Sequence, residues 1–168
     1  MKTSLNRWPV IEPGTGGLLV TRAVPGTRGK VRLTLHKEVA PVLLWVAARV
    51  HAEVRSLSAN NKNGQDDGGY NYRQARNANG FSNHASGTAI DLNWRTWPML
   101  GRRRSMNVKE QAAARAIARD AAPVVAWGGN WISMVDEMHW EIRPGTTVSQ
   151  LRDFMQAHGI QQDGTVKQ

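Results

Sequence analysis

The chain has 168 residues, the length of one domain that can bury a hydrophobic core without cross-links. It contains no cysteine, which excludes disulfides, thiolate metal sites and cysteine nucleophiles, so any metal must be bound by His, Asp or Glu. Its 22 basic and 13 acidic side chains give a net charge of +9, which favours a polyanionic partner such as nucleic acid, an anionic membrane or an acidic wall polymer.

The first half of the chain predicts one strand and one long helix. Residues 1–30 are rich in Gly, Pro and Thr and are expected to form loops with short extended pieces. Residues 31–35 alternate as in a strand. Apolar residues spaced three and four apart from 37 to 54 predict a helix, with Pro41 in its first turn. Residues 58–69 contain only turn formers and predict a loop.

The second half predicts short strands between two capped helices. Asn107 with Glu110, and Thr147 with Gln150, match the capping-box pattern at helix starts. In chain order we expect a strand at 88–93, a loop at 94–106, a helix at 107–121, strands at 124–127 and 138–142, a helix from 147 to Gly159 and a frayed polar tail at 161–168. This irregular interleaving favours an α+β fold, with a small antiparallel sheet flanked by helices, over a doubly wound fold.

No part of the sequence predicts insertion into a membrane. No apolar run reaches the roughly 18 residues that a membrane-spanning helix needs. The first residues also lack the apolar stretch of a secretory signal peptide. We therefore expect the chain to accumulate in the cytoplasm in which it is made.

The segment from Phe81 to Asp91 carries the clearest chemical signal. His84 lies in a loop of small residues, Asp91 lies in the strand that follows, and Gly87 permits a turn that lets the two side chains converge. An imidazole nitrogen and a carboxylate oxygen are both ligands of Zn²⁺. Because catalytic zinc takes three protein ligands and keeps one position open, a further His from a distant part of the chain is expected.

Four histidines are available as that third ligand. His36 and His51 flank or lie on the first predicted helix and His158 ends the last one, positions typical of surface or capping histidines. His139 instead lies in a predicted strand among several tryptophans. It is therefore the favoured ligand, and the alternative is a core histidine satisfied by hydrogen bonds.

Acidic residues around His139 supply a candidate general base. Asp136 precedes His139 by three residues, so its carboxylate can reach water on a bound metal if a turn precedes the strand. Glu137 is the alternative base. Glu141 shares a strand face with His139 and is expected to contact a ligand or the substrate.

Three runs of residues resemble the LAS metallopeptidases, the group of lysostaphin, the D-alanyl-D-alanine metallopeptidases and the hedgehog signalling domain. SNHASGTAID (82–91) is similar to the SxHxxGxAxD signature of the group. WGGNW (127–131) with DEMHWE (136–141) resembles the WGGxW…DxxHxE ending of the D-alanyl-D-alanine carboxypeptidase and phage endolysin branch, which is L-alanyl-D-glutamate peptidase-like. YNYR (70–73) is similar to a Tyr/Arg segment of that branch.

The resemblance covers roughly residues 31–142, with two departures. Trp140 stands where many members have Phe, and Asn130 stands where Asp is more usual. Neither position is a metal ligand. Residues 1–30 match no segment of the group.

The resemblance implies one zinc ion and a set of roles around it. His84, Asp91 and His139 would bind the zinc, and Asp136 would be the general base. An arginine near the metal would stabilise the oxyanion, since a fixed cation favours developing negative charge.

That arginine is assigned to Arg73, with Arg76 as the alternative. Ser82, Glu141 and Trp140 are expected to contact substrate, and Ser82 has the further alternatives of orienting a ligand or forming a turn.

We therefore interpret residues 1–168 as a single zinc peptidase domain with a hedgehog or D-Ala-D-Ala-peptidase-like fold. It would hydrolyse a peptide bond of bacterial peptidoglycan as a phage endolysin or its catalytic domain, drawn to the wall by its charge. It would be a monomer that stays in the host cytoplasm until release. The alternatives are a D,D-carboxypeptidase that trims terminal D-Ala and a non-catalytic, zinc-containing module that binds the wall.

One feature favours a nucleic-acid binder instead. Arg102, Arg103 and Arg104 form a basic run beside Trp94 and Trp97. Such a run more often marks an exposed loop, and no nucleic-acid-binding motif accompanies it. We therefore expect no nucleic-acid partner.

Overall fold

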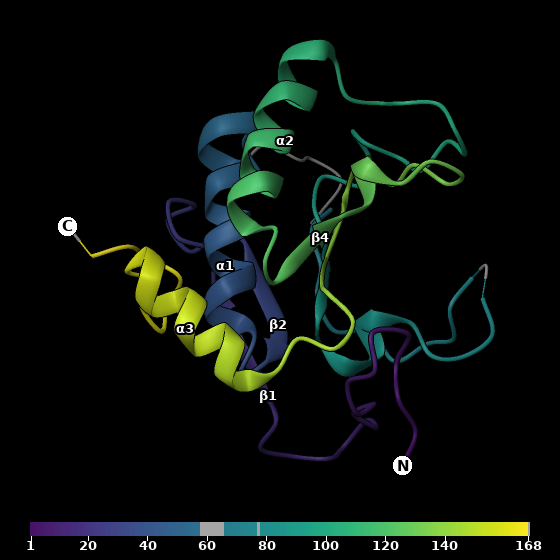
Figure 1. Cartoon of the computed structure of the whole chain (residues 1–168), viewed down its shortest axis with the longest axis vertical. Coiled ribbons are helices and arrows are strands. Elements are labelled where there is room, and N and C mark those ends of the chain that lie inside the picture. The colour runs from purple at the N-terminus through teal and green to yellow at the C-terminus, as the bar shows by residue number, and fades with distance from the viewer. Residues whose placement is uncertain (58–65, 77, 168) are drawn as a thin grey trace.

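Three helices and two small antiparallel sheets surround the hydrophobic core of the computed structural model, which describes residues 1–57, 66–76 and 78–167 (Figure 1). One sheet pairs β1 (Leu19–Ala23) with β2 (Arg32–His36). The other has the order β3-β5-β4, formed by β3 (Ala89–Asp91), β5 (His139–Ile142) and β4 (Val125–Trp127). The helices are α1 (Ala40–Arg49), α2 (Val108–Ala121) and α3 (Val148–His158). The predicted α+β class with antiparallel sheets and flanking helices is confirmed.

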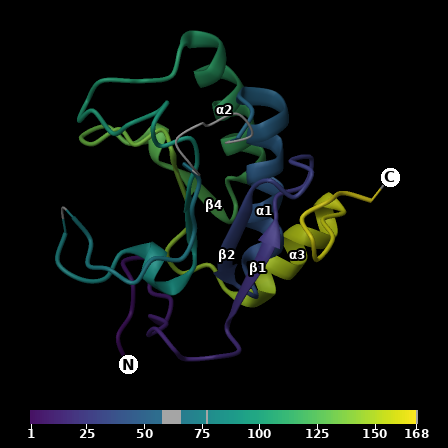
Figure 2. The same cartoon turned by 180° about the vertical axis from the view of Figure 1, so that it is seen from behind.

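Helix α1 is central to the packing. It contacts α2, α3 and both strands of the β1–β2 sheet, as the two opposite views show (Figures 1 and 2). Eight of its ten residues are buried, and it continues into the π-helical turn η1 (Val50–Val54), so the helix predicted at 37–54 is confirmed. No helix in the described part of the chain is long and apolar enough to cross a membrane.

Both later helices begin with the capping boxes that the sequence predicts. The Asn107 side chain accepts the Glu110 N–H at 3.0 Å, and the Glu110 carboxylate accepts the Asn107 N–H at 3.0 Å. Thr147 and Gln150 exchange the same pair of bonds at the start of α3. These bonds satisfy N–H groups that the first helical turn leaves without a partner.

The two ends of the chain differ in how well the sequence predicts them. The short extended pieces expected near the N-terminus include β1, which pairs with β2 through its whole length. The tail expected to fray at 161–168 is folded over its described part, where Ile160 pairs with Val166. Gly164 makes this possible: it has φ +83° and lies so close to Leu44 that a Cβ would stand 2.6 Å from the Leu44 Cβ. Most of the loop predicted at 58–69 lies outside the described residues.

The first residues of the chain pack against η2, a short 3₁₀ helix formed by Asn83–Ser86. The Leu5 N–H donates to the Phe81 carbonyl at 3.0 Å, and the Ile11 N–H donates to the Ala85 carbonyl at 2.9 Å. Both views show this N-terminal coil beside the segment that contains η2 (Figures 1 and 2). The N-terminal segment therefore supports the loop that precedes β3.

Candidate metal centre

Two neighbouring strands and the turn before them bring three predicted ligands together. Asp91 in β3 lies opposite His139 in the antiparallel register of β3 and β5, and η2 places His84 shortly before β3. Each residue offers one ligand atom, and these atoms lie within 4.8 Å of one another. Among the described residues this is the group of His, Asp and Glu side chains whose geometry could hold a metal.

The turn that carries His84 explains two residues of the SxHxxG pattern. Ser82 caps η2, because its hydroxyl accepts the His84 N–H at 3.3 Å. Gly87 ends η2 in the left-handed region at φ 67°, and a Cβ there would stand 2.6 Å from the His36 nitrogen. Glycine is therefore needed both for the turn and for its close approach to β2.

Hydrogen bonding orients the ring of His84 for metal binding. Its Nδ1 lies 2.7 Å from the Gly69 carbonyl, which can only accept, so Nδ1 donates a proton there and Nε2 is the nitrogen left to face a metal. Nε2 is buried, lies 3.2 Å from an Asp91 oxygen and has no hydrogen-bond partner among the described residues. A buried, unpaired imidazole nitrogen beside a carboxylate fits a metal ligand, because such a group otherwise costs stability.

His139 lies between two carboxylates. Its Nδ1 is 2.8 Å from Asp91 Oδ1, and its Nε2 is 2.8 Å from Glu141 Oε2. Burial alone would lower the pKa of His139, but these hydrogen bonds outweigh it and raise the pKa to about 10. Burial alone would raise the pKa values of Asp91 and Glu141, but the histidines lower both below their usual range.

The donor set fits zinc. With Nε2 of His139 bonded to Glu141, Nδ1 is the nitrogen that faces Asp91 and the cluster. Two imidazole nitrogens and one carboxylate oxygen are typical ligands of zinc in catalytic sites, which keep a further position open. At neutral pH a metal would displace a proton from His139, because both carboxylates favour the protonated ring.

Asp136 lies at the same centre without a hydrogen-bond partner for one of its oxygens. The turn expected before β5 is present, since the Asp136 carbonyl accepts the His139 N–H at 3.2 Å. Asp136 is 9% exposed, and its Oδ1 finds no partner in the described part of the chain. Burial is the main reason that its pKa rises to about 6; His139 and Arg76 oppose the rise and Asp91 adds to it. Such a carboxylate is suited to accept a proton near neutral pH.

A glycine lets this turn form. Gly128 follows β4, and its carbonyl accepts the Asp136 N–H at 3.1 Å. A Cβ on Gly128 would stand 2.4 Å from the Asp136 carbonyl oxygen. The first glycine of the WGGxW run is thus required by the close approach of the chain that places Asp136.

Glu137 does not fit the role of alternative base. Its carboxylate accepts the N–H groups of Ser105 at 2.6 Å and Met106 at 2.8 Å, and it pairs with Arg104 at 3.3 Å. The residue is 2% exposed and does not line the cleft around the metal centre. Its hydrogen bonds hold the loop that precedes α2, which is a structural role.

A cleft of about 680 Å³ is lined by two of the three cluster residues. His139, Asp91, Asp136 and Glu141 line it, and so do Arg73 and Arg76 from the segment before η2. Its apolar lining comes mostly from the loops after β3 and after β4, through Trp94, Pro98, Met99, Trp131, Met134 and Met138. The cleft therefore offers both cationic and apolar contacts beside the cluster.

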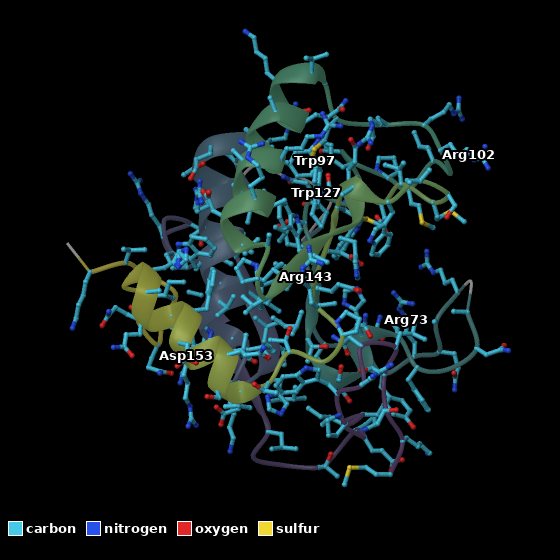
Figure 3. The ribbon with its side chains drawn as sticks, in the orientation of Figure 1. Arg73, Trp97, Arg102, Trp127, Arg143 and Asp153 are labelled. Carbon is cyan, nitrogen blue, oxygen red and sulfur yellow. The ribbon has the colours of Figure 1, made fainter. Side chains whose placement is uncertain are left out.

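The expected substrate contacts lie in different places. Ser82, Glu141 and Arg73 line the cleft. Figure 3 shows Arg73 on the side of the molecule opposite α3, which carries the labelled Asp153. Trp140 does not fit a contact with substrate, because it is fully buried and stacks on Trp127 with ring centroids 5.4 Å apart. Successive residues of a strand face opposite sides, so His139 and Glu141 face the cleft while Trp140 faces the core.

Sequence reasoning missed two residues that belong to the site. Asn83 donates to Glu141 at 2.6 Å, and Leu5 from the N-terminal segment lines the cleft. Asn83 occupies a variable position of the SxHxxG pattern, and Leu5 precedes η2 by nearly eighty residues. Neither residue has a local signal that could have identified it.

The remaining histidines are used elsewhere. His36 packs edge-on against Trp8, His51 accepts the Leu57 N–H at 3.0 Å, and His158 stacks on Phe154. None of the three joins the cluster of described metal-binding side chains.

The basic run does not form one surface with the neighbouring tryptophans. Arg104 donates to the Gly129 carbonyl at 2.8 Å and pairs with Glu137, and Trp97 is fully buried. Arg102 and Arg103 are exposed, and Figure 3 shows Arg102 at the edge of the molecule. Trp97 therefore cannot join the exposed arginines in one surface, and the absence of a nucleic-acid partner stays a prediction.

Comparison with known families gives one match. Residues 75–142, less than half of the chain, match the family model of D-alanyl-D-alanine carboxypeptidase. The matched segment contains the three cluster residues and Asp136, but it begins after Arg73 and excludes the N-terminal segment. No curated protein and no solved structure gives a significant match. The match supports a metallopeptidase.

Proposed function

We propose that the chain is a zinc-dependent peptidase that hydrolyses a peptide bond of bacterial peptidoglycan. The observation that carries the proposal is a cluster of three metal-binding side chains, two of which line one cleft together with Asp136, whose Oδ1 has no hydrogen-bond partner among the described residues. Structural zinc sites are closed by four protein ligands, whereas catalytic sites have three and an open position. The family match over residues 75–142 supports the same kind of enzyme.

Each side chain has a defined task in this hydrolysis. Zinc, when bound, would supply Lewis acidity to polarise the scissile carbonyl and acidify water. Asp136 accepts the proton of the attacking water and can deliver it to the leaving amine. The Gly69 carbonyl and Glu141 hold the rings in the orientation that points Nε2 of His84 and Nδ1 of His139 at the cluster.

Two arginines in the cleft could stabilise the negative charge that develops on the substrate during hydrolysis. Arg73 and Arg76 both line the cleft, and the charge of Arg76 opposes the rise in the pKa of Asp136 that burial causes. A fixed cation near the carbonyl oxygen stabilises the tetrahedral oxyanion as it forms. We assign this role to Arg73, with Arg76 beside it, and the two single alanine variants distinguish their contributions.

The lining of the cleft is suited to wall peptides. These peptides carry carboxylates together with small apolar side chains. Arginines can bind the carboxylates, and the methionine and tryptophan side chains can pack against the methyl groups. The net charge of +9 supports attraction to an anionic wall polymer.

We extend the proposal to the biological setting. A peptidase of this kind can serve as a phage endolysin, kept in the host cytoplasm until it is released to the wall. All ligands and the base come from one chain, so a monomer would be sufficient. A non-catalytic wall-binding module is less well supported, because it would have no use for the unpaired Asp136.

A D,D-carboxypeptidase is the second candidate. The description of the matching family, D-alanyl-D-alanine carboxypeptidase, favours it. The two activities share the same chemistry and differ in the bond that is cut. A carboxypeptidase releases free D-Ala and leaves the wall cross-linked, whereas an endopeptidase solubilises it.

Digestion of purified peptidoglycan tests both candidates. We expect zinc-loaded protein to release soluble fragments, and mass spectrometry of their new ends should identify one type of peptide bond. A chelator should abolish the reaction. Release of D-Ala alone would select the carboxypeptidase, and no new end of either type from zinc-loaded, folded protein would refute the proposal.

A further inference from the structure

The N-terminal segment, residues 2–11, is joined to the metal centre by a continuous series of hydrogen bonds. We infer that this segment is part of the centre and that Asn6 is a positioning residue for His139. The inference rests on the proposed metal site. It concerns residues that lie outside the segment matched by the family model.

Asn6 is held in place by bonds to three parts of the chain. It is fully buried, and its Nδ2 donates to Thr88 Oγ1 at 2.8 Å and to the Ile142 carbonyl at 3.0 Å. Its Oδ1 accepts from the Ser4 hydroxyl at 2.7 Å. Thr88 precedes β3 and Ile142 ends β5, so one amide connects the two strands that carry Asp91 and His139.

The backbone of Asn6 sets the orientation of the next amide in the series. The Asn6 N–H donates to Asn83 Oδ1 at 2.8 Å. Because an amide has its acceptor and its donor on opposite sides, this bond directs Asn83 Nδ2 toward Glu141, to which it donates at 2.6 Å. Without the bond from Asn6, the amide could rotate and present its oxygen to the carboxylate.

Glu141 connects Asn83 to the proposed metal ligand His139. The Glu141 Oε2 that accepts from Asn83 also lies 2.8 Å from His139 Nε2. With Nε2 donating to Glu141, Nδ1 is the nitrogen available at the cluster. Partners that orient a ligating histidine typically change metal affinity by about 10–100-fold when they are removed.

Further contacts fix the segment against η2. The Ser4 hydroxyl lies 2.9 Å from the Ser86 hydroxyl, and the Tyr70 hydroxyl donates to the Ile11 carbonyl at 2.6 Å. Leu5, between Ser4 and Asn6, lines the cleft itself. Because the segment meets the cluster on the side of Glu141, its effect should be on metal binding as well as on folding.

Zinc affinity measured together with stability tests the inference. The variants are Asn6→Ala and Asn83→Ala, each compared with wild type by competition against a chromogenic chelator and by thermal unfolding of the metal-free protein. Thr27→Ala is the control, because Thr27 is also buried and its hydroxyl donates to the Val24 carbonyl at 2.7 Å in the turn between β1 and β2, away from the cleft. The absorption spectrum of the Co²⁺-substituted proteins reports the ligand geometry.

We expect Asn83→Ala and Asn6→Ala to weaken zinc binding by about 10–100-fold, Asn83→Ala more strongly, and to alter the Co²⁺ spectrum. Thr27→Ala should lower the melting temperature and leave zinc affinity unchanged. If Asn6→Ala does not fold, Asn83→Ala alone decides the result. Wild-type zinc affinity in the folded Asn83→Ala protein would overturn the inference, whereas absence of zinc binding by wild type would overturn the proposed function instead.

Discussion

Asp136 and Glu137 are neighbours in the chain but belong to two different clusters of buried polar groups. The two clusters differ in how many of their polar groups have hydrogen-bond partners. The Glu137 carboxylate accepts two backbone N–H groups, a serine hydroxyl and an arginine. At the metal centre, Asp136 Oδ1 and His84 Nε2 are buried without hydrogen-bond partners among the described residues, although His84 Nε2 lies 3.2 Å from an Asp91 oxygen. Two indole nitrogens in the core also lack a hydrogen-bond partner among the described residues, but of these four groups only His84 and Asp136 are ionisable.

The difference separates groups that stabilise the fold from groups that are available for a ligand. A buried charge is tolerated when it is fully hydrogen-bonded, and Glu137 meets that condition. An unpaired buried ionisable group costs stability, so its presence in a cleft indicates binding or catalysis. Substitutions at the two neighbouring acids should therefore have opposite kinds of effect.

The largest effect is expected on catalysis from Asp136→Asn. The variant keeps the size of the side chain but cannot accept a proton, so peptidoglycan hydrolysis should fall by about 10²–10⁴-fold. Zinc content and the circular dichroism spectrum should match wild type. Hydrolysis close to the wild-type rate in the zinc-loaded variant would remove Asp136 from the mechanism.

The next largest effect is expected on stability from Glu137→Ala. Loss of the carboxylate leaves the N–H groups of Ser105 and Met106 without their acceptor and Arg104 without its charge partner. We expect a loss of about 2–4 kcal/mol in the free energy of unfolding, measured with urea. Hydrolysis per folded molecule should be retained at low temperature. A stable, inactive Glu137→Ala protein would show that the wrong carboxylate was assigned as base.

A smaller effect, of opposite sign, is expected on the stability of the metal-free Asp136→Asn protein. Burial raises the pKa of Asp136 to about 6, so the folded state binds this proton more tightly than the unfolded state does. The stabilisation from this proton is present at pH 4 and is lost as the pH rises through 6. Asn cannot ionise, so the variant should be more stable than wild type by about 2 kcal/mol at pH 8 and equal at pH 4. Urea unfolding at both pH values measures this, and a variant that is less stable at pH 8 would contradict it.

The smallest effect is expected from the exposed basic residues. Arg102→Gln with Arg103→Gln should slow hydrolysis of intact wall a few-fold at low salt, less at high salt, and spare a short soluble wall peptide. Arg104 is left unchanged because its bonds to Gly129 and Glu137 are structural.

The control is Arg28→Gln with Lys30→Gln, an equal loss of charge in the turn between β1 and β2, at the other side of the molecule (Figure 1). Equal slowing by both pairs would attribute the effect to net charge rather than to the loop that carries Arg102.

The sequence was sufficient where a local pattern determines the structure. The capping boxes at Asn107 and Thr147 predicted the starts of α2 and α3, because the bonds join residues three apart. Short extended pieces were expected near the N-terminus, but the bounds of β1 were not predicted, because they depend on pairing with β2, which a sequence rich in Gly and Pro does not indicate.

The same distinction applies at the site. The types and spacing of residues were enough to identify His84, Asp91 and His139 as candidate ligands. The bond between Asn6 and Asn83 joins residues 77 positions apart, so no motif contains it. Trp140 was predicted to contact substrate from its position beside His139, and the alternation of β5 turns it to the core instead.

Titration of the metal-free protein with zinc tests the central claim most directly. After metal is removed with a chelator, hydrolysis of peptidoglycan should rise in proportion to added zinc and level off at one zinc per chain. The His84→Ala and His139→Ala proteins should neither retain zinc nor gain activity. Full hydrolysis by protein shown to contain no metal, or full zinc occupancy in both histidine variants, would contradict the claim.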